Sequence, residues 1–465
     1  MLDEHQLMRI MLAGMNDIQE WRLGDARLAA AKGYPLEFPA PTIDDYGIVF
    51  VDVALEASTG GLVSHEVNGP NAVGSDALTG SSPDRARVEV AQTLQRAREM
   101  GYLSRDGELK EAVVTIHAHQ HWSAFRTGGE FYPRVGRFAQ LLEESLGRNV
   151  VALRGGAEEL GDESITVVMG DVPAVTDGIQ VDPTSVRLLY RGRPVVFVGN
   201  PNVVPELVRT GRLAAAMAGY DKRVFHAWRL TETFFDKGLQ QDLWRGTPIR
   251  SLSYFEAGSE QEVFEQTKKM LASGSCVLKP NGGSGGAGIH GVSSDMTDAE
   301  IRVAIRSVIS DHVAKYGPNS EATMWPIRGF EFVRSTGYPM EDGEHLWDLR
   351  IAVQFEPGRA HVYPVSIRLA PDPFDPQTWF KDRNQWISNV SGREVTLLKS
   401  GLDDLALASV GLTNEKMQQL LDACVVWTVK AWDSSVRNGG SRGNVYEDYC
   451  EIEDPGFYPT ASFNG

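Results

Sequence analysis

The sequence predicts an α/β (α+β) protein assembled from several packed units. Strand-like and helix-like segments alternate through 111–215, and two apolar runs flank a Ser-Thr-Gly-Gly turn near the start of the chain. A long glycine-rich segment, 281–288, joins two further strands. Because a single core stops growing well below 465 residues, we expect about three packed units. The sequence shows no internal repeat.

The composition is that of a folded, acidic protein. Hydrophobic residues make up 42% and charged residues 23%, which are ordinary values for globular domains. The formal net charge is -17, from 62 acidic and 45 basic side chains, and no long basic cluster occurs. We therefore expect neither nucleic acid nor an anionic membrane as a partner. A nucleotide remains compatible where a few basic side chains and a divalent cation share the charge of its phosphates.

The sequence favours a reducing cytoplasm as the location. The three cysteines, Cys276, Cys424 and Cys450, lie far apart, so neither a disulfide framework nor a paired-cysteine metal site is indicated. The N-terminal segment carries acidic residues early and is amphipathic, unlike a secretory signal. No apolar run reaches the roughly 18 residues of a membrane span.

Each expected element follows from periodicity or turn chemistry. Apolar positions at helical spacing predict helices, whereas β-rich runs bounded by turn residues predict strands. Residues 216–275 look helix-rich. The other expected helices are 4–31, 84–100, 134–146 and 413–432. The expected strands are the hairpin 46–55 and 62–67, followed by 112–120, 149–155, 184–190, 194–200, 275–279, 289–292, 324–333, 346–356 and 359–370.

The segment with the most specific chemistry is a lysine followed by glycines. Glycines let several backbone N–H groups approach phosphate closely, and a lysine on the preceding strand reaches phosphate oxygens. The order excludes a P-loop, in which lysine follows the glycines, and a dinucleotide fingerprint, which enters a helix. A flexible surface hairpin is the alternative. The candidate nucleotide ligands are Lys279, Gly283, Ser284, Gly285, Gly286 and Ala287.

This lysine-led loop resembles that of the ATP-grasp superfamily, where such a loop closes over the triphosphate of ATP. The resemblance implies that Glu331, Phe332 and Val333 form the hinge strand that holds adenine. It also implies that Lys222, directly after Asp221, is the second nucleotide lysine. A buried aromatic strand and a solvated lysine are the ordinary alternatives for these two segments.

The magnesium ligands implied by the resemblance occur in the N-terminal hairpin. Family members carry an Asp on one strand and Glu-x-Asn on the next in the C-terminal part, and the tail of this chain lacks that pattern. The hairpin supplies Asp52 on one strand and Glu66 and Asn68 on its partner. Magnesium prefers such oxygen ligands, and an unpaired carboxylate in an apolar strand is costly. The resemblance implies two Mg²⁺ ions, and a purely structural hairpin is the alternative.

The chain therefore resembles a circularly permuted ATP-grasp protein. In the common order, a helix like the one expected near the C-terminus runs directly into a strand like the first of the hairpin. New termini at that junction give the present order, and such a rearrangement costs little energy where the original termini lie close together. The expected units are the N-terminal helix with the metal hairpin, an α/β substrate domain, a nucleotide-binding subdomain and the remaining C-terminal subdomain, over 1–110, 111–215, 216–345 and 346–465.

Three more positions resemble family residues that face the phosphates and the acyl phosphate. Arg350 and Arg368 lie on candidate strands, and Asn389 lies in a Trp-x-x-Asn segment. Arginine suits this role because its charge is permanent and its donors form a fixed fork. Arg350 could equally form a structural pair with Asp348 or another acid.

A histidine-rich strand and the loop after it are candidates for binding substrate. Zinc is disfavoured there, because in-line strand neighbours rarely converge on one ion, and we expect His117 and His119 to line the substrate pocket. The loop resembles the family's substrate loop, in which helix N-terminal N–H groups hold an anionic group. A plain strand-to-helix turn would also explain it. Its candidate residues are Arg126, Gly128, Gly129 and Glu130.

These features together predict an ADP-forming carboxylate–amine ligase that uses ATP and Mg²⁺. The resemblance implies that ATP phosphorylates a carboxylate and that an amine then attacks the acyl phosphate. The expected small-molecule substrates are amino acids or short peptides, as in peptide-forming ligases of natural-product pathways. The alternatives are acyl transfer to a carrier-protein thiol, a small-metabolite kinase and an inactive nucleotide sensor. The identity of the substrates, a homo-oligomeric state and the role of 433–465 stay open.

Overall fold

The structure is a computed structural model, and it confirms a mixed α/β fold with several sheets. The helix expected over 4–31 and Cys450 lie outside the residues that it describes. The described residues are 37–69, 85–119, 135–148, 150–154, 160, 164–182, 187–199, 203, 206, 207, 210–212, 230, 233, 236–281, 286, 288–317, 324–388, 398–400 and 404–437.

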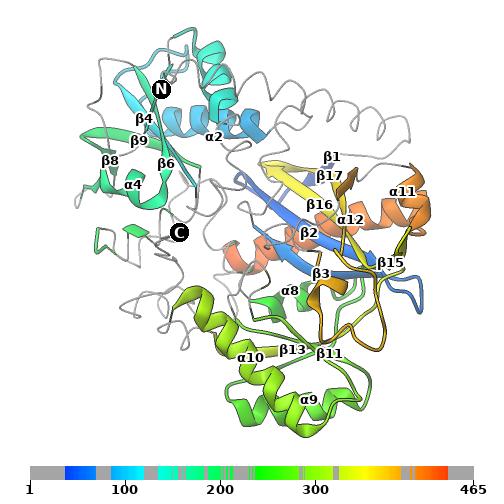
Figure 1. Cartoon of the computed structure of the whole chain (residues 1–465). Helices are drawn as coiled ribbons and strands as arrows, with labels where there is room; N and C mark the ends of the chain where they lie inside the picture. The colour runs from blue at the N-terminus through cyan, green and yellow to red at the C-terminus, as the bar shows by residue number, and fades with distance from the viewer. Residues whose placement is uncertain are drawn as a thin grey trace.

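The central sheet joins strands from both ends of the described chain (Figure 1). Its order is β1-β17-β16-β2-β3, with β18 beside β17, and all of its pairings are antiparallel. The predicted N-terminal hairpin is confirmed as β2 and β3. The strands are β1 (Glu37–Ala40), β2 (Gly47–Leu55), β3 (Leu62–Asn68), β16 (Trp347–Glu356), β17 (Gly358–Leu369) and β18 (Leu398–Ser400).

Both faces of this sheet are covered, which explains why every residue of β2 is buried. On one face lies α12 (Asn414–Ala431), which confirms the predicted C-terminal helix and buries Leu420 and Trp427 completely. On the other face, Ile48 and Phe50 of β2 pack into the cluster that includes α2 (Arg85–Glu99). Burial of apolar side chains on both sides fixes the register of the strands, because a slip by one residue would exchange the two faces.

The second unit is the α/β structure predicted over 111–215. Its sheet has the order β5-β6-β4-β9-β8-β7, with β5, β6, β4 and β9 parallel. α2 and a helix over 135–146 pack on one face and α4 on the other, as parallel strands require. The elements are β4 (Val113–His119), β5 (Val150–Arg154), β6 (Ile165–Asp171), α4 (Val172–Asp177), β7 (Ile179–Val181), β8 (Leu188–Tyr190) and β9 (Arg193–Val198).

The third unit carries the lysine-led loop on an antiparallel sheet of order β10-β13-β11-β12. α9 and α10 cover one face of it. On the other face, Tyr254 and Phe330 pack with Ala54 and Val63 of the N-terminal hairpin. This contact sets the strand that ends in Lys279 beside the predicted metal hairpin. The elements are β10 (Tyr254–Ala257), α9 (Glu260–Leu271), β11 (Cys276–Lys279), β12 (His290–Val292), α10 (Asp298–Tyr316) and β13 (Ile327–Glu331).

The prediction that 216–275 is helix-rich needs a correction, because this stretch also contains β10, which pairs with β13 at the edge of the third sheet.

Cys276 and Cys424 are free, buried thiols. Among the described helices, none is long and apolar enough to span a membrane. The remaining elements are α8 (Lys237–Leu243), β14 (Tyr338–Met340), β15 (Gly343–His345), η3 (Arg383–Gln385), α11 (Asp404–Ser409) and η4 (Trp432–Arg437).

Candidate active site

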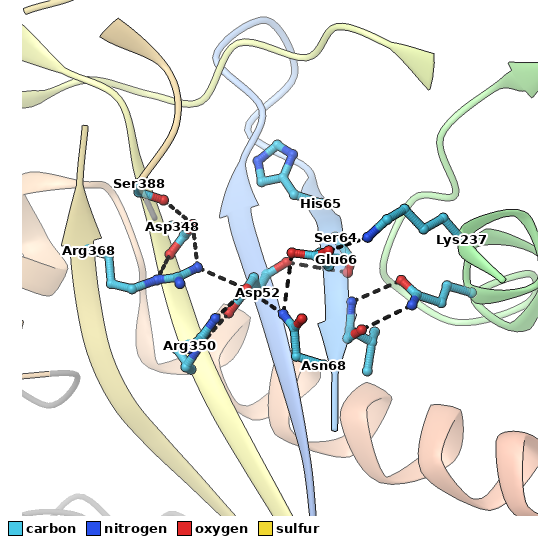
Figure 2. Close-up of polar contacts among 12 residues, drawn as sticks. Asp52, Ser64, His65, Glu66, Asn68, Lys237, Asp348, Arg350, Arg368 and Ser388 are labelled. Carbon is cyan, nitrogen blue, oxygen red and sulfur yellow. Dashed lines mark hydrogen bonds and ion pairs between the residues drawn. The ribbon is translucent and has the colours of Figure 1, made fainter. Parts of the chain in front are cut away.

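Strand register gathers charged side chains on one face of the central sheet (Figure 2). Asp52 of β2 lies opposite Arg350 of β16 and Glu66 of β3, and Asp348 lies opposite Arg368. Directly opposite residues of antiparallel strands share a face, so all five side chains emerge on the same side. The reverse side of these strands is apolar and packs on α12.

Asp52 is held by two arginines. Arg350 donates to it through Nε and Nη2, each at 2.8 Å, and Arg368 Nη2 lies 2.9 Å from Oδ2. Burial alone would raise the pKa of Asp52, but the two guanidinium groups hold it below its ordinary value. The carboxylate is therefore ionised. The acidic partner of Arg350, which the sequence left open as Asp348 or another acid, is Asp52.

Arg368 forms a second fork with Asp348. Its Nε and Nη2 lie 2.6 and 2.7 Å from the two carboxylate oxygens, and the Ser388 hydroxyl also donates to Asp348. Burial, opposed by Arg368 and reinforced by Asp52, raises the pKa of Asp348. Burial by itself would lower the pKa of Arg368. The two carboxylates raise this pKa by more, so the guanidinium stays charged. Both predicted arginines thus lie in the site.

Glu66 and Asn68 complete the predicted metal set. Asn68 Nδ2 lies 3.2 Å from Asp52 Oδ2 and 3.4 Å from Glu66 Oε2, so one amide reaches both carboxylates. Lys237 of α8 donates to the other oxygen of Glu66. Burial would raise the pKa of Glu66, but Lys237 and Lys279 lower it from 4.5 to about 2.

The Glu66 pair predicts a pH dependence of stability. Because the folded pKa is depressed, the contribution of Glu66 is fully present above the unfolded pKa of 4.5 and is lost as pH falls towards about 2. The stability advantage of the unaltered protein over Glu66→Gln should therefore shrink as pH is lowered from about 6 to about 3, measured by urea unfolding at each pH. A difference that stays constant with pH would contradict the depressed pKa.

The donor chemistry of this face fits Mg²⁺. The side-chain amide of Asn68 lies within hydrogen-bond reach of two ionised carboxylates, Asp52 and Glu66, and hard divalent cations prefer such oxygens. Turning the Asn68 amide over would present its oxygen in place of its nitrogen. Within the described ranges, no three His, Cys, Asp or Glu side chains cluster as a metal site, so among these residues the third side-chain ligand would be this amide.

Lys279 faces the same hairpin from the third unit. Its Nζ lies 3.5 Å from the backbone oxygen of His65 and 5.3 Å from the centre of the Phe330 ring. Burial, together with the nearby Lys237, lowers the pKa of Lys279 to about 8. A cation held here next to an apolar ring is available to a phosphate, which would also restore its charge.

Of the predicted glycine loop, Gly286 is described and has φ 74°. Gly288 has φ 68°, and an added Cβ there would lie 2.8 Å from the backbone oxygen of Val308, so the loop must end on glycine. Gly283, Ser284, Gly285 and Ala287 lie outside the described residues.

Several groups of the predicted hinge strand already bind other parts of the protein. The amides of Glu331 and Phe332 donate to the backbone oxygens of Ser253 and Ser275, at 3.0 and 2.8 Å. The Phe332 ring stacks on Trp379 at 3.9 Å. Any contact of this segment with adenine must therefore use other groups, such as the backbone of Val333, whose side chain is buried.

Two site residues escaped the sequence analysis. Lys237 follows Asp236 at the start of α8, so the same Asp-Lys doublet that suggested Lys222 could have identified it. His65 lies at the register shift between β2 and β3, amid Lys279, Asp52 and Arg368, and Figure 2 shows it beside the cluster. Burial and then Lys279 lower the pKa of His65 to about 4. A register shift of this kind leaves no local sequence pattern.

α8 is fixed against the open edge of β3 by side-chain amides. Gln240 accepts from the Val67 amide and donates to the Val67 carbonyl, both at 3.0 Å. Gln241 donates to the Ser64 carbonyl at 3.2 Å. The glutamines replace a missing neighbouring strand and set Lys237 above Glu66.

Replacing Gln240 with Leu should therefore lower the free energy of unfolding by about 2–4 kcal/mol, because it leaves a buried N–H and a buried C=O of β3 without partners. Urea unfolding measures this. Gln419→Leu, a change of the same chemistry at an exposed position of α12, should alter stability by less than about 0.5 kcal/mol. Equal effects of the two changes would refute the role of Gln240.

The prediction that His117 lines the substrate pocket is wrong. Its side chain is 0% exposed, and its ring lies 4.4 Å from Phe138 and 5.2 Å from Phe197 in the core of the second unit. The alternating histidine pattern reflects a strand buried on both faces. Several other candidates lie outside the described residues: Lys222, Arg126, Gly128, Gly129, Glu130, Asn389 and the side chain of His119.

Comparison with known proteins gives only weak similarities. The sequence matches no protein-family model and no curated protein. The structure is similar to D-alanyl-alanine synthetase A from Vibrio cholerae, with a TM-score of 0.40 and 11% identity over 70% of this chain and 82% of that one. For a glutathione synthetase-like effector from Globodera pallida, the TM-score is 0.33, with 11% identity over 78% and 82%. For N5-carboxyaminoimidazole synthetase from Staphylococcus aureus, complexed with ADP, it is 0.27, with 7% identity over 62% and 80%. Similarities this low carry no argument about function, which has to come from the site.

Proposed function

We propose that this protein is an ADP-forming ATP-grasp ligase that activates a carboxylate as an acyl phosphate and joins it to an amine. One observation carries the proposal. The structure brings the oxygen ligands Asp52, Glu66 and Asn68 together with the two arginines on one sheet face, and sets Lys237 of α8 and Lys279 of the third unit against them. Phosphoryl transfer requires acidic side chains that bind a metal cation, and next to them basic side chains that bind the phosphates.

The residues divide into two sets. Asp52, Glu66 and Asn68 would hold Mg²⁺, which when bound neutralises phosphate charge and orients the triphosphate. Lys279 and Lys237 would contact phosphate oxygens of ATP, a role in which Lys237 takes the place first assigned to Lys222. In the first step the substrate carboxylate attacks the γ-phosphorus and ADP leaves. In the second step the amine attacks the acyl carbon, loses a proton and expels phosphate.

Arg350 and Arg368 would face the transferred phosphoryl group. Each now satisfies a buried carboxylate, so both are held in fixed orientations by the fold. Preorganised donors of this kind stabilise charge that develops in the transition state without further reorganisation.

The positions of the elements support a circular permutation. Lys416, near the start of α12, donates to the Gly60 carbonyl in the turn of the N-terminal hairpin at 2.9 Å. At the other end of α12, Trp432 packs edge-on against Phe355, which lies opposite Gly47, the first residue of β2. The end of α12 is thus close to the start of β2, where the common family order would connect them.

The test is release of ADP and phosphate from MgATP, screened against the common amino acids singly and in pairs, with mass spectrometry of the products. The proposal expects ADP release that requires two substrates, and a product mass equal to their sum minus water. Formation of AMP, or a stable phosphorylated product without any amine, would overturn it in favour of other ATP chemistry. Tight ATP binding without turnover would favour a nucleotide sensor.

A further inference from the structure

Arg328 of β13 is a buried cation held by three separate segments. Its Nε lies 2.8 Å from Glu256 Oε1 in β10, and its Nη1 lies 2.6 Å from Asn281 Oδ1. Its Nη2 lies 3.1 Å from Asp236 Oδ1, just before α8. The residue is only 4% exposed, so these bonds are well shielded from water. The planar guanidinium uses its fixed fork to set three elements relative to one another.

Strand pairing places Arg328 between a basic and an acidic residue. It lies directly opposite Lys279 in the pairing of β11 with β13, and opposite Glu256 in the pairing of β10 with β13. Opposite residues share a sheet face, and like charges there destabilise an antiparallel pair. The carboxylates of Asp236 and Glu256 balance the positive charge that Arg328 brings next to Lys279.

Two of the three partners of Arg328, Asp236 and Asn281, adjoin a proposed phosphate-binding lysine. Asp236 caps α8 by accepting from the Leu239 amide at 2.9 Å, and the next residue is Lys237. Asn281 follows Lys279 by two positions, and its backbone N–H donates to the Met324 carbonyl at 2.8 Å. A shift of Arg328 would therefore move the start of α8 and the start of the glycine loop together.

We propose that Arg328 is a positioning residue that sets the separation of Lys237 and Lys279 for the triphosphate of ATP, through Asp236 and Asn281. This inference rests on the proposed function and adds a specific determinant of nucleotide affinity. Each of the three guanidinium nitrogens of Arg328 already binds one of these partners: Nε binds Glu256, Nη1 binds Asn281 and Nη2 binds Asp236.

The experiment measures the Kd of MgADP and MgATP, together with the melting temperature, for Arg328→Lys, Arg328→Met and Asp236→Asn. Arg328→Lys keeps the charge and removes the fork, and Asp236→Asn keeps a good helix cap while weakening the bond to Arg328. Each should weaken nucleotide binding at least about tenfold, because small displacements of binding groups have large effects. Arg302→Met is the matched control. Arg302 packs on Phe264 and binds Gln261 in the same unit, away from the site, and its replacement should leave the Kd unchanged.

A double-mutant cycle separates positioning from general stability. If Arg328 acts through α8, the loss caused by Arg328→Lys should shrink to less than about threefold when Lys237 is already replaced by Met. Wild-type affinity in Arg328→Lys and in Asp236→Asn, or fully additive losses in the cycle, would overturn the inference while leaving the ligase proposal intact. If the unaltered protein binds neither MgADP nor MgATP, the proposed function fails, and this inference fails with it.

Discussion

Replacing Glu66 with Gln is expected to lower ADP release by about 10³-fold or more. The substitution keeps the size and shape of the side chain but removes one of the two carboxylates that would hold the cation. It also releases Lys237, whose partner is Glu66 Oε1. Loss of a metal contribution of several kcal/mol to transition-state stabilisation corresponds to a change of this size, at about 1.4 kcal/mol per factor of ten.

The measurement is steady-state ADP release at increasing Mg²⁺ concentration. Partial recovery at high Mg²⁺ would be consistent with a weakened cation site. Glu344→Gln serves as the control, because Glu344 pairs only at the surface with Arg334 and should leave the rate unchanged. Full activity of Glu66→Gln would refute the proposal that Glu66 holds Mg²⁺ for the reaction. Melting temperatures of both variants well above the assay temperature would exclude unfolding as the cause of a lost rate.

Replacing Arg368 with Met is expected to lower the free energy of unfolding by about 3–5 kcal/mol and to abolish turnover. Arg368 is 5% exposed and is shared by Asp348 and Asp52. Removing it leaves Asp348 buried with only the Ser388 hydroxyl donating to it among the contacts of this cluster. An uncompensated buried charge is among the most destabilising single changes.

Urea unfolding followed by tryptophan fluorescence measures this loss. The double variant Asp348→Asn/Arg368→Met should regain at least about half of the stability, because the buried charge is removed with its partner, yet it should remain inactive. Arg334→Met, which breaks the exposed pair with Glu344, should cost less than about 1 kcal/mol. A double variant as unstable as Arg368→Met would show that the cost comes from lost packing and not from the charge.

Much of the fold could be predicted from the sequence because its signals are local. The N-terminal hairpin and α12 appear where alternation and helical spacing placed them. The lysine-led loop also begins where the sequence indicated. Buried or irregular segments were predicted less well. A strand covered on both faces, such as the one with His117, has no polar side to reveal which residues face solvent.

Some contacts of the site could not be predicted, because they depend on register between strands far apart in the chain. Asp52 and Arg350 are separated by 298 positions, and the choice of Asp52 over Asp348 as the partner of Arg350 follows from how β2 pairs with β16. Two Asp-Lys doublets occur in the sequence, and only the packing of α8 on the edge of β3 brings Lys237 to Glu66. The residues next to Asp52 or Lys237 in the sequence do not reveal these long-range contacts, because the contacts depend on strand register and packing.

The sequence by itself determined the kinds of groups present: oxygen ligands on a hairpin, a lysine before glycines, and arginines on later strands. These depend on residue type and spacing within a few positions, which the chain carries directly. Only the tertiary structure decided that these groups share one face, and that Arg328 ties the two lysine-bearing segments together. Such arrangements arise when separate sheets bury their apolar faces and fix the register between strands that lie far apart in the sequence.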